Sequence, residues 1–387
     1  MLKLGGIHKM KIIIGGDLVP TKANMEKFKN DDFFQSLDVN FKKVWSEADF
    51  RVFNLECPLC EYTNKNEKNG ACIQAPEDAI NGIKSLNPNL VLLSNNHILD
   101  YRVEGLDNTI KLLEEHNIEY TGIIENSQAT YEPYFINCGN KRICVYNVCE
   151  TEFSIATENR KGANPLNEAK NYREIENAKN NCDYLIVAFH AGKEFYRFPS
   201  PNLQRICRNF IDFGADFVIT QHSHCIGCEE EYNGGKILYG QGNFIFDDGV
   251  VDEYWGNALL VEVDVSEKGV IVNYIPIEMA NGLIKLSKND MILRDFYKRS
   301  ELIKSNEFVK EEYSKFANKN INMYLGIMNK PNVLKRALNK LLKRKFYTKL
   351  YDKKKCLQIL NVIECEAHRE LFTQGLKERI KGFEYED

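Results

Sequence analysis

The chain has 387 residues, of which 43% are hydrophobic and 27% are charged, and its formal net charge is −4. This composition is typical of a globular protein with one large domain and an extension, or with two domains. So small a net charge gives no support for nucleic-acid binding, and no stretch approaches the roughly 20 apolar residues of a membrane span.

The N-terminus and the cysteines indicate the compartment. In MLKLGGIHKMKIIIGGD the apolar run from Ile12 to Ile14 is too short for the hydrophobic region of a secretory signal. The 12 cysteines are scattered through a chain too large to need disulfide bonds for stability. We therefore expect a cytoplasmic protein with reduced thiols, although the pairs Cys57/Cys60 and Cys225/Cys228 also suit a metal or redox site.

Five short apolar runs have the length and β-branched content of buried strands, and each ends in a side chain of a type that binds metals. In chain order they are KIIIGGD, ending at Asp17; DFRVFNLE, at Glu56; NLVLLSNNH, at Asn96 and His97; DYLIVAFH, at His190; and ADFVITQHSH, at His222 and His224. Helical patterns occupy residues 105–118 and 202–214. Because ligands of α/β sheets gather beyond the carboxyl ends of strands, the five runs predict one common site.

The remaining chain predicts more strands and then helices. Further strands are expected at residues 141–148, 235–246, 257–265 and 269–279. After about residue 289 Lys, Glu and Leu dominate and the pattern becomes helical. We therefore predict a domain over residues 10–285 and a helical C-terminal extension over residues 286–387.

The residues at the strand ends suit a site for two divalent metals, because carboxylate, amide and imidazole ligands occur together. The candidate ligands are Asp17, Glu56, Asn96, His190, His222 and His224. His97 should point away from its neighbour Asn96, which leaves its imidazole free to act as a general acid. Asp100, three residues further on, could orient that imidazole.

The stretch QHSHCIGC permits a second interpretation. His222, His224, Cys225 and Cys228 have the chemistry of a closed tetrahedral zinc site. We favour the open site, in which both histidines join distant partners and the two cysteines are small buried hydrophobic residues.

The motifs GGDLVP, NLECPL, LSNNHILDYRVEGLDNTI, FHAGKEF, QHSHCIG and YGQGNFIFD resemble, in order and spacing, those of the CapA family. That family comprises capsule and poly-γ-glutamate biosynthesis proteins related to calcineurin-like metallophosphoesterases. The resemblance covers roughly residues 10–250. It implies an α/β fold of four layers, in which two mixed β-sheets are flanked by helices, and two divalent metal ions, with manganese, iron or zinc the best candidates.

The resemblance also implies a role for each matching residue. Asp17 and His224 would hold the first metal, and Glu56 would bridge to the second. The second metal would be held by Asn96, His190 and His222, with His97 as the catalytic imidazole.

Two further positions match the family pattern and two depart from it. Glu194 and Asn243 match family positions that would support the ligands or contact the substrate. Val19 stands where the classical first motif has a histidine, and Gln221 stands where relatives often have another.

A basic segment, KPNVLKRALNKLLKRKFYTKLYDKKK, runs from Lys330 to Lys355 with Asp352 as its only acid. Its leucines recur at helical spacing, which predicts an amphipathic cationic helix. Such a helix can attach to an anionic membrane from the cytoplasmic side or dock a polyanionic substrate. In the alternative interpretation it packs through its leucines and exposes a solvated basic face.

The function expected from these features is that of a metal-dependent phosphoric ester hydrolase. The family link implies a phosphorylated or anionic polymer-related substrate in cell-envelope polymer synthesis. The alternative is a non-hydrolytic accessory or assembly protein for capsule or poly-γ-glutamate synthesis, which keeps the site for binding.

Overall fold

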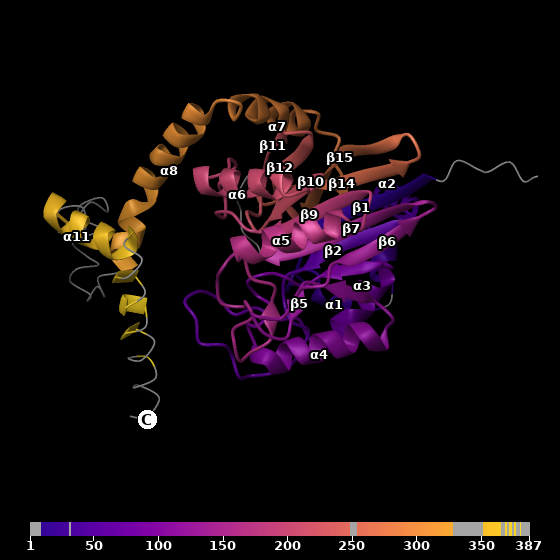
Figure 1. Ribbon diagram of the computed structural model, residues 1–387. Helices are drawn as coiled ribbons and strands as arrows, with labels where there is room; N and C mark the ends of the chain where they lie inside the picture. Colours follow the sequence, from indigo (N-terminus) through magenta and orange to yellow (C-terminus); the bar gives the residue numbers. More distant parts are fainter. Residues whose placement is uncertain are drawn as a thin grey trace, which may run out of the picture. The chain divides into compact units, whose positions relative to one another are not determined.

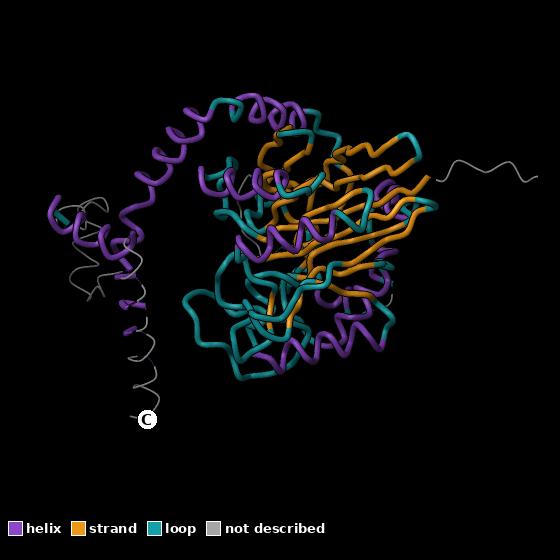
Figure 2. The backbone as a smooth tube through the Cα atoms, in the orientation of Figure 1, coloured by secondary structure: helices purple, strands orange, loops and turns teal. Residues whose placement is uncertain are grey.

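The computed structural model describes residues 9–327, apart from Asp31 and residues 248–253, and most of residues 351–380, with gaps at 365–367, 370, 374 and 377–379. Two compact units divide the chain, Met1–Lys310 and Glu311–Asp387. Figure 1 gives the order of the elements, and Figure 2 separates the helices from the strands.

The first sheet of the first unit has eight strands. Its order is β16 (Leu283–Leu286), β15 (Gly269–Ala280), β14 (Asn257–Ser266), β1 (Lys9–Leu18), β2 (Phe50–Leu55), β3 (Leu90–Leu92) and β4 (Glu119–Thr121), and β13 (Asn243–Ile245) also pairs with β1. Strands β1 to β4 are parallel to one another, whereas β14, β15 and β16 join antiparallel.

The second sheet has six strands. Its order is β11 (Ile226–Tyr232), β12 (Gly235–Gln241), β10 (Phe217–Gln221), β9 (Tyr184–His190), β7 (Lys141–Cys149) and β6 (Tyr134–Cys138). The four inner strands are parallel and the two edge strands are antiparallel. A small pair, β5 (Ile123–Ile124) and β8 (Gly162–Ala163), lies apart from both sheets.

Alternating side chains place the two sheets face to face. On β1, Ile12 and Ile14 belong to a buried cluster that also contains Ile186 and Ile219 of the second sheet. Ile13 between them belongs to a different cluster, on the opposite face. This alternation is the period of two that a strand imposes on its side chains. The apolar runs are therefore continuous because both faces of these strands are buried.

Helices cover the outer face of each sheet. The first sheet is covered by α1 (Met25–Phe28), α2 (Val39–Ser46), α3 (Ile80–Ser85) and α4 (Arg102–Glu115), whose apolar residues share its outer cluster. The second sheet is covered by α5 (Glu168–Lys179) and α6 (Pro201–Asp212). Short 3₁₀ turns span Phe33–Ser36 and Glu77–Ala79. The predicted four-layer fold, two mixed sheets between helices, is confirmed.

The segment expected as one strand over residues 235–246 is two strands in different sheets. β12 ends at Gln241 in the second sheet, and β13 begins at Asn243 beside β1 of the first. Gly242 between them has a φ of 81°, and a Cβ there would lie 2.8 Å from the Asn257 carbonyl oxygen. Only glycine suits this crossing, and the crossing places Asn243 opposite Asp17 in register.

Helices follow the last strand. α7 (Met291–Leu302) still belongs to the first unit, because Phe296 is buried in the cluster between the sheets and Arg299 Nε donates to the Gly227 carbonyl. α8 (Asn306–Ile327) runs from the first unit into the second, which also contains α11 (Lys353–Glu364). The domain boundary near residue 285 stays a prediction.

Most of the basic segment 330–355, with its predicted helix, lies outside the described residues. Among the residues that are described, no helix combines the length and the apolarity needed to cross a membrane.

Candidate metal centre

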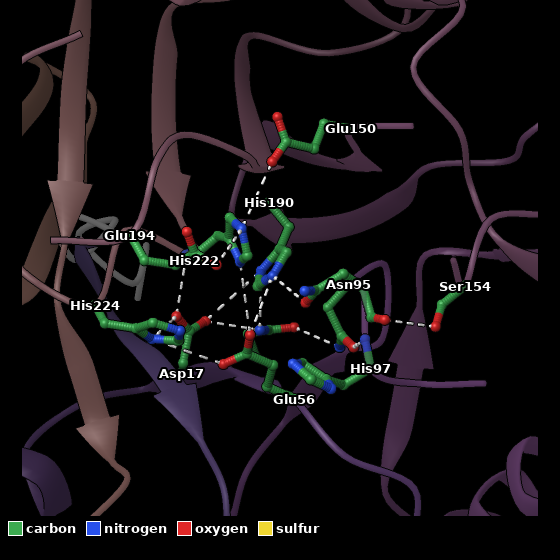
Figure 3. Close-up of polar contacts among 12 residues, drawn as sticks. Asp17, Glu56, Asn95, His97, Glu150, Ser154, His190, Glu194, His222 and His224 are labelled. Carbon is green, nitrogen blue, oxygen red and sulfur yellow. Dashed lines mark hydrogen bonds and ion pairs between the residues drawn. The ribbon is translucent and has the colours of Figure 1, made fainter. Parts of the chain in front are cut away.

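The carboxyl ends of strands from both sheets meet at one site (Figure 3). The first sheet contributes residues of β1, of the position after β2, and of the loop after β3: Asp17, Glu56 and Asn96. The second sheet contributes the end of β9 and the turn after β10: His190, His222 and His224. All six side chains predicted as ligands are brought together and buried.

Glu56 is shared by the two halves of the site. Its carboxylate forms one buried group with His190 and His222 and another with Asp17 and His224, and the ligand-type atoms of each group lie within 4.8 Å of one another. Within the described part of the chain, neither carboxylate oxygen of Glu56 has a hydrogen-bond partner, and neither does His222 Nδ1. Buried polar atoms without a hydrogen-bond partner lower the stability of the folded state. Metal binding by Glu56 and these imidazoles would give these atoms a partner.

Asn96 belongs to the half of the site that contains His190. His190 Nε2 lies 3.0 Å from Asn96 Oδ1 and 3.2 Å from Glu56 Oε1. An amide oxygen, a carboxylate oxygen and an imidazole nitrogen therefore converge on one point. Such a donor set suits manganese, iron or zinc.

The charges of the ligands follow from burial and proximity. Burial lowers the pKa of His190 and of His224, so both favour the neutral imidazole that binds metals. Burial also lowers the pKa of His222, but contact with Glu56 and the charge of Glu150 outweigh it and raise that pKa above its ordinary value.

The two buried carboxylates differ in the direction of their pKa shifts. Burial and the neighbouring charge of Glu56 raise the pKa of Asp17 to about 6. Burial acts on Glu56 in the same direction, but the three surrounding histidines outweigh it and hold its pKa well below the usual range. Glu56 is therefore ionised at neutral pH, and Asp17 is the carboxyl group of the pair that takes up a proton first.

A strained turn presents the two histidines after β10. His222 has a φ of 84° and His224 a φ of 54°, both in the left-handed region that residues with side chains rarely adopt. The His222 N–H donates to Asp17 Oδ2 at 3.1 Å, which fixes the turn against β1. Both imidazoles are thereby directed into the site.

Asn243 and Glu194, which the family pattern gives as supporting or substrate-contacting positions, lie near different histidines of the centre. Asn243 Oδ1 is 2.8 Å from His224 Nδ1, so β13 orients that imidazole. Glu194 Oε1 is 4.0 Å from His222 Nε2. Glu150, which follows β7, is nearer to the same nitrogen at 3.6 Å.

Glu150 and Asn54 were missed by the sequence analysis. Glu150 directly follows a strand-like run, so the rule that found the other strand-end residues would have found it. Asn54 Nδ2 donates to Asp17 Oδ1 at 2.7 Å and lies 3.3 Å from His190 Nδ1. Its signal was a polar residue inside a buried strand, two positions before Glu56 and therefore on the same face.

Ser154 was missed as well, and no sequence signal indicated it. Its hydroxyl donates to the Asn96 carbonyl at 2.7 Å and accepts from the Leu99 N–H at 3.1 Å. It fixes the loop of β3 from a segment far along the chain.

His97 lies beside the centre but in neither ligand group. Its Nδ1 is 2.6 Å from Asp100 Oδ2, and its backbone N–H donates to Asn95 Oδ1 at 3.1 Å. The His97 side chain is 18% exposed, whereas Asp100 is fully buried. Because Nδ1 faces Asp100, the ring presents Nε2 on its other side.

The departures from the family pattern have structural roles. Val19 is buried in the core between the first sheet and its helices. Gln221 Nε2 donates to the Gly15 carbonyl and to Gln241 Oε1, which ties the two sheets together. Cys225 and Cys228 are fully buried, and the metal-type groups of the described chain contain His222 and His224 but neither cysteine. This geometry favours the open site over the closed zinc site.

The sequence model of the bacterial capsule synthesis protein PGA_cap matches residues 11–248, which is more than half of the chain. The chain belongs to the PGA_cap family. The resemblance to CapA proteins is thereby confirmed, and the matched segment contains every strand end that forms the metal centre.

Three relatives illustrate the similarity. The capsule biosynthesis protein CapA of Bacillus anthracis is 26% identical over 289 residues, which cover 71% of this chain and 69% of that protein. The PGA biosynthesis protein CapA of Bacillus subtilis is 26% identical, over 57% of this chain and 58% of that protein. A probable polyglutamine synthesis accessory protein of Mycobacterium tuberculosis is 25% identical, over 57% of this chain and 62% of that protein.

Proposed function

We propose that this PGA_cap protein is a metal-dependent phosphoesterase that acts in the synthesis of a capsule or poly-γ-glutamate polymer. The observation that carries the proposal is the position of Glu56, a buried carboxylate shared by two groups of metal-type side chains. The names of the Bacillus relatives support the link to capsule and poly-γ-glutamate synthesis. The substrate expected is an ester of phosphate on a polymer-related molecule.

Some residues of the site would bind metal, and His97 would transfer a proton. Two divalent metals at this site would supply positive charge to the phosphoryl oxygens and would make water a better nucleophile at neutral pH. Asp17, Glu56 and His224 would hold one metal, and Glu56, Asn96, His190 and His222 the other.

His97 would protonate the leaving oxygen. Its Nδ1 faces Asp100, so Nε2 is the atom that would give the proton to the substrate. Asp100 would hold the ring in that orientation. His97 is partly exposed while the ligand candidates are buried, so a substrate can reach its side chain.

Metal-dependent turnover tests this function. Purified protein loaded with manganese would be assayed on phosphomonoesters and phosphodiesters, with protein treated with a chelator as the control. We expect hydrolysis of at least one class that is lost with the metal. Absence of turnover on every ester tested would contradict the proposal.

A non-hydrolytic accessory role is the second candidate, and Val19 favours it. Without a histidine at this position, one metal group contains only Asp17, Glu56 and His224. The Mycobacterium relative is itself named an accessory protein. In this role the protein would bind anionic polymer through its metals without turnover, and binding would be lost in Glu56→Gln.

We also propose contact between the basic segment 330–355 and the anionic inner face of the membrane. The segment has a single acid, Asp352, among many lysines and arginines. Full-length protein should sediment with vesicles that contain anionic lipid, at low ionic strength, and not with vesicles of neutral lipid. Equal sedimentation with both would contradict this contact.

A further inference from the structure

Lys68 lies in the loop between β2 and the 3₁₀ turn at Glu77–Ala79. Glu56, at the start of this loop, is the metal-ligand candidate nearest to it in the sequence. Its neighbours Glu67 and Asn69 are exposed, but the Lys68 side chain is only 2% exposed. A lysine on an exposed loop ordinarily keeps its ammonium group in water. The burial of this one therefore indicates a specific partner.

The partner is the carboxylate that faces His97. Lys68 Nζ forms an ion pair with Asp100 Oδ1, and it lies 3.3 Å from His97 Nδ1. The ammonium also lies over the Phe153 ring, 5.3 Å from its centroid. Lys68 and His97 thus approach the same carboxylate side by side, each at a different oxygen.

Asp100 also fastens the loop that carries Lys68. Its Oδ2 accepts from the Ile73 N–H at 2.8 Å, and its carbonyl oxygen accepts from the Asn66 N–H at 2.8 Å. The carboxylate is therefore held from three directions, by Lys68, Ile73 and His97. A buried carboxylate that faced an imidazole alone would keep one oxygen without a donor, at a substantial cost in free energy.

We propose that Lys68 is a positioning residue of the proposed phosphoesterase. Lys68 does not touch the substrate and acts on it only through Asp100 and His97. The inference rests on the proposed function. Lys68 fixes the direction of the Asp100 carboxylate, and this direction in turn fixes the imidazole that donates to the leaving group. Without the ammonium, Oδ1 loses its partner, the carboxylate can rotate, and the ring loses its alignment.

The matched variants are Lys68→Met, Lys68→Arg and Lys65→Met. Methionine keeps the length and apolar stem of lysine without its charge, and arginine restores the charge. Lys65 lies on the same loop but is exposed, so its replacement is the control. Metal content, measured by elemental analysis, should be the same in all three variants and in wild type.

The kinetic outcome separates positioning from substrate binding. With manganese-loaded protein, Lys68→Met should lower kcat for esters with poor leaving groups by about 10- to 100-fold while KM stays within about twofold. Aryl phosphates with activated leaving groups should be nearly unaffected, and Lys68→Arg should recover most of the loss. A Lys68→Met variant that raises KM equally for all esters, or that equals wild type, would overturn the proposal.

A second measurement does not depend on turnover. Amide hydrogen exchange at Asn66 and Ile73 should be slow in wild type, Lys68→Arg and Lys65→Met, and faster in Lys68→Met. If wild type hydrolyses no ester, the proposed function fails. Unchanged exchange in Lys68→Met would overturn the role of Lys68 independently of that result.

Discussion

Asn54 donates a 2.7 Å hydrogen bond to Asp17 at the buried floor of the metal centre. The same amide lies 3.3 Å from His190 Nδ1, so one side chain orients ligand candidates of both halves. Such partners of metal ligands commonly change metal affinity by about 10- to 100-fold when removed.

Asn54→Leu should therefore weaken metal binding by about 10- to 100-fold while every ligand stays in place. Calorimetric titration of chelator-treated protein with manganese measures the affinity. Asn24→Leu is the control, because the Asn24 amide donates to the Gly282 carbonyl and belongs to neither metal group. Equal affinities in both variants would argue against an orienting role.

The number of metals lost should differ between variants. Glu56→Gln should lower the content of both metals, because Glu56 is the residue common to the two groups. His190→Ala and His222→Ala should each lower the metal content of the group that these two histidines form with Glu56. Elemental analysis of purified protein measures the stoichiometry.

His116 provides a matched control for these histidine variants. Its Nδ1 bonds the Leu112 carbonyl at the end of α4, outside the centre. His116→Ala should keep wild-type metal content. Full retention of metal in both His190→Ala and His222→Ala would contradict the assignment.

Much of the site could be predicted because the relevant strands are buried on both faces. Packing does not explain a polar residue in or directly after such a strand, so Asp17, His190 and His222 stood out. Parallel strands then bring their carboxyl ends to one edge. The fold followed from the same runs and from the family motifs.

The features that the sequence did not predict depend on contacts between segments distant in sequence. Ser154 reaches the loop of Asn96, and Lys68 reaches Asp100, through folding of loops without periodic patterns. The division of residues 235–246 between two sheets depended on Gly242, whose positive φ leaves no trace in hydrophobic periodicity. Local pattern predicts the elements, whereas these links arise only in the packed structure.

Metal retention should depend on pH through Asp17. Burial and Glu56 raise the pKa of Asp17 to about 6, so the carboxyl group takes up a proton as the pH falls through this value and competes with the metal. The stability of the metal-free protein should change with pH in the opposite direction. The pKa of Asp17 is higher in the folded than in the unfolded protein, so its contribution to stability is lost as the pH rises through about 6.

The difference in Tm between metal-loaded and metal-free protein should therefore grow between about pH 5 and pH 7.5. Differential scanning calorimetry at several pH values measures it. In Asp17→Asn, which cannot titrate at this position, the difference should be smaller and flatter. A wild-type difference independent of pH would count against this account of Asp17.

The cysteines after His224 should not contribute to metal binding. The double variant Cys225→Ala and Cys228→Ala should keep wild-type metal content, although the loss of two buried sulfur atoms should lower its Tm. Elemental analysis decides between the two sites. Loss of zinc in this variant, with His190→Ala unaffected, would favour the closed zinc site.

The leaving-group dependence of His97→Ala tests the central claim most directly. The variant should keep its metals, because His97 belongs to neither ligand group. If His97 is the general acid, kcat should fall by about 10²–10⁴-fold for esters with poor leaving groups and much less for activated aryl phosphates. Asp100→Asn should show a milder form of the same selectivity. A His97→Ala variant as active as wild type on both kinds of ester would contradict the account.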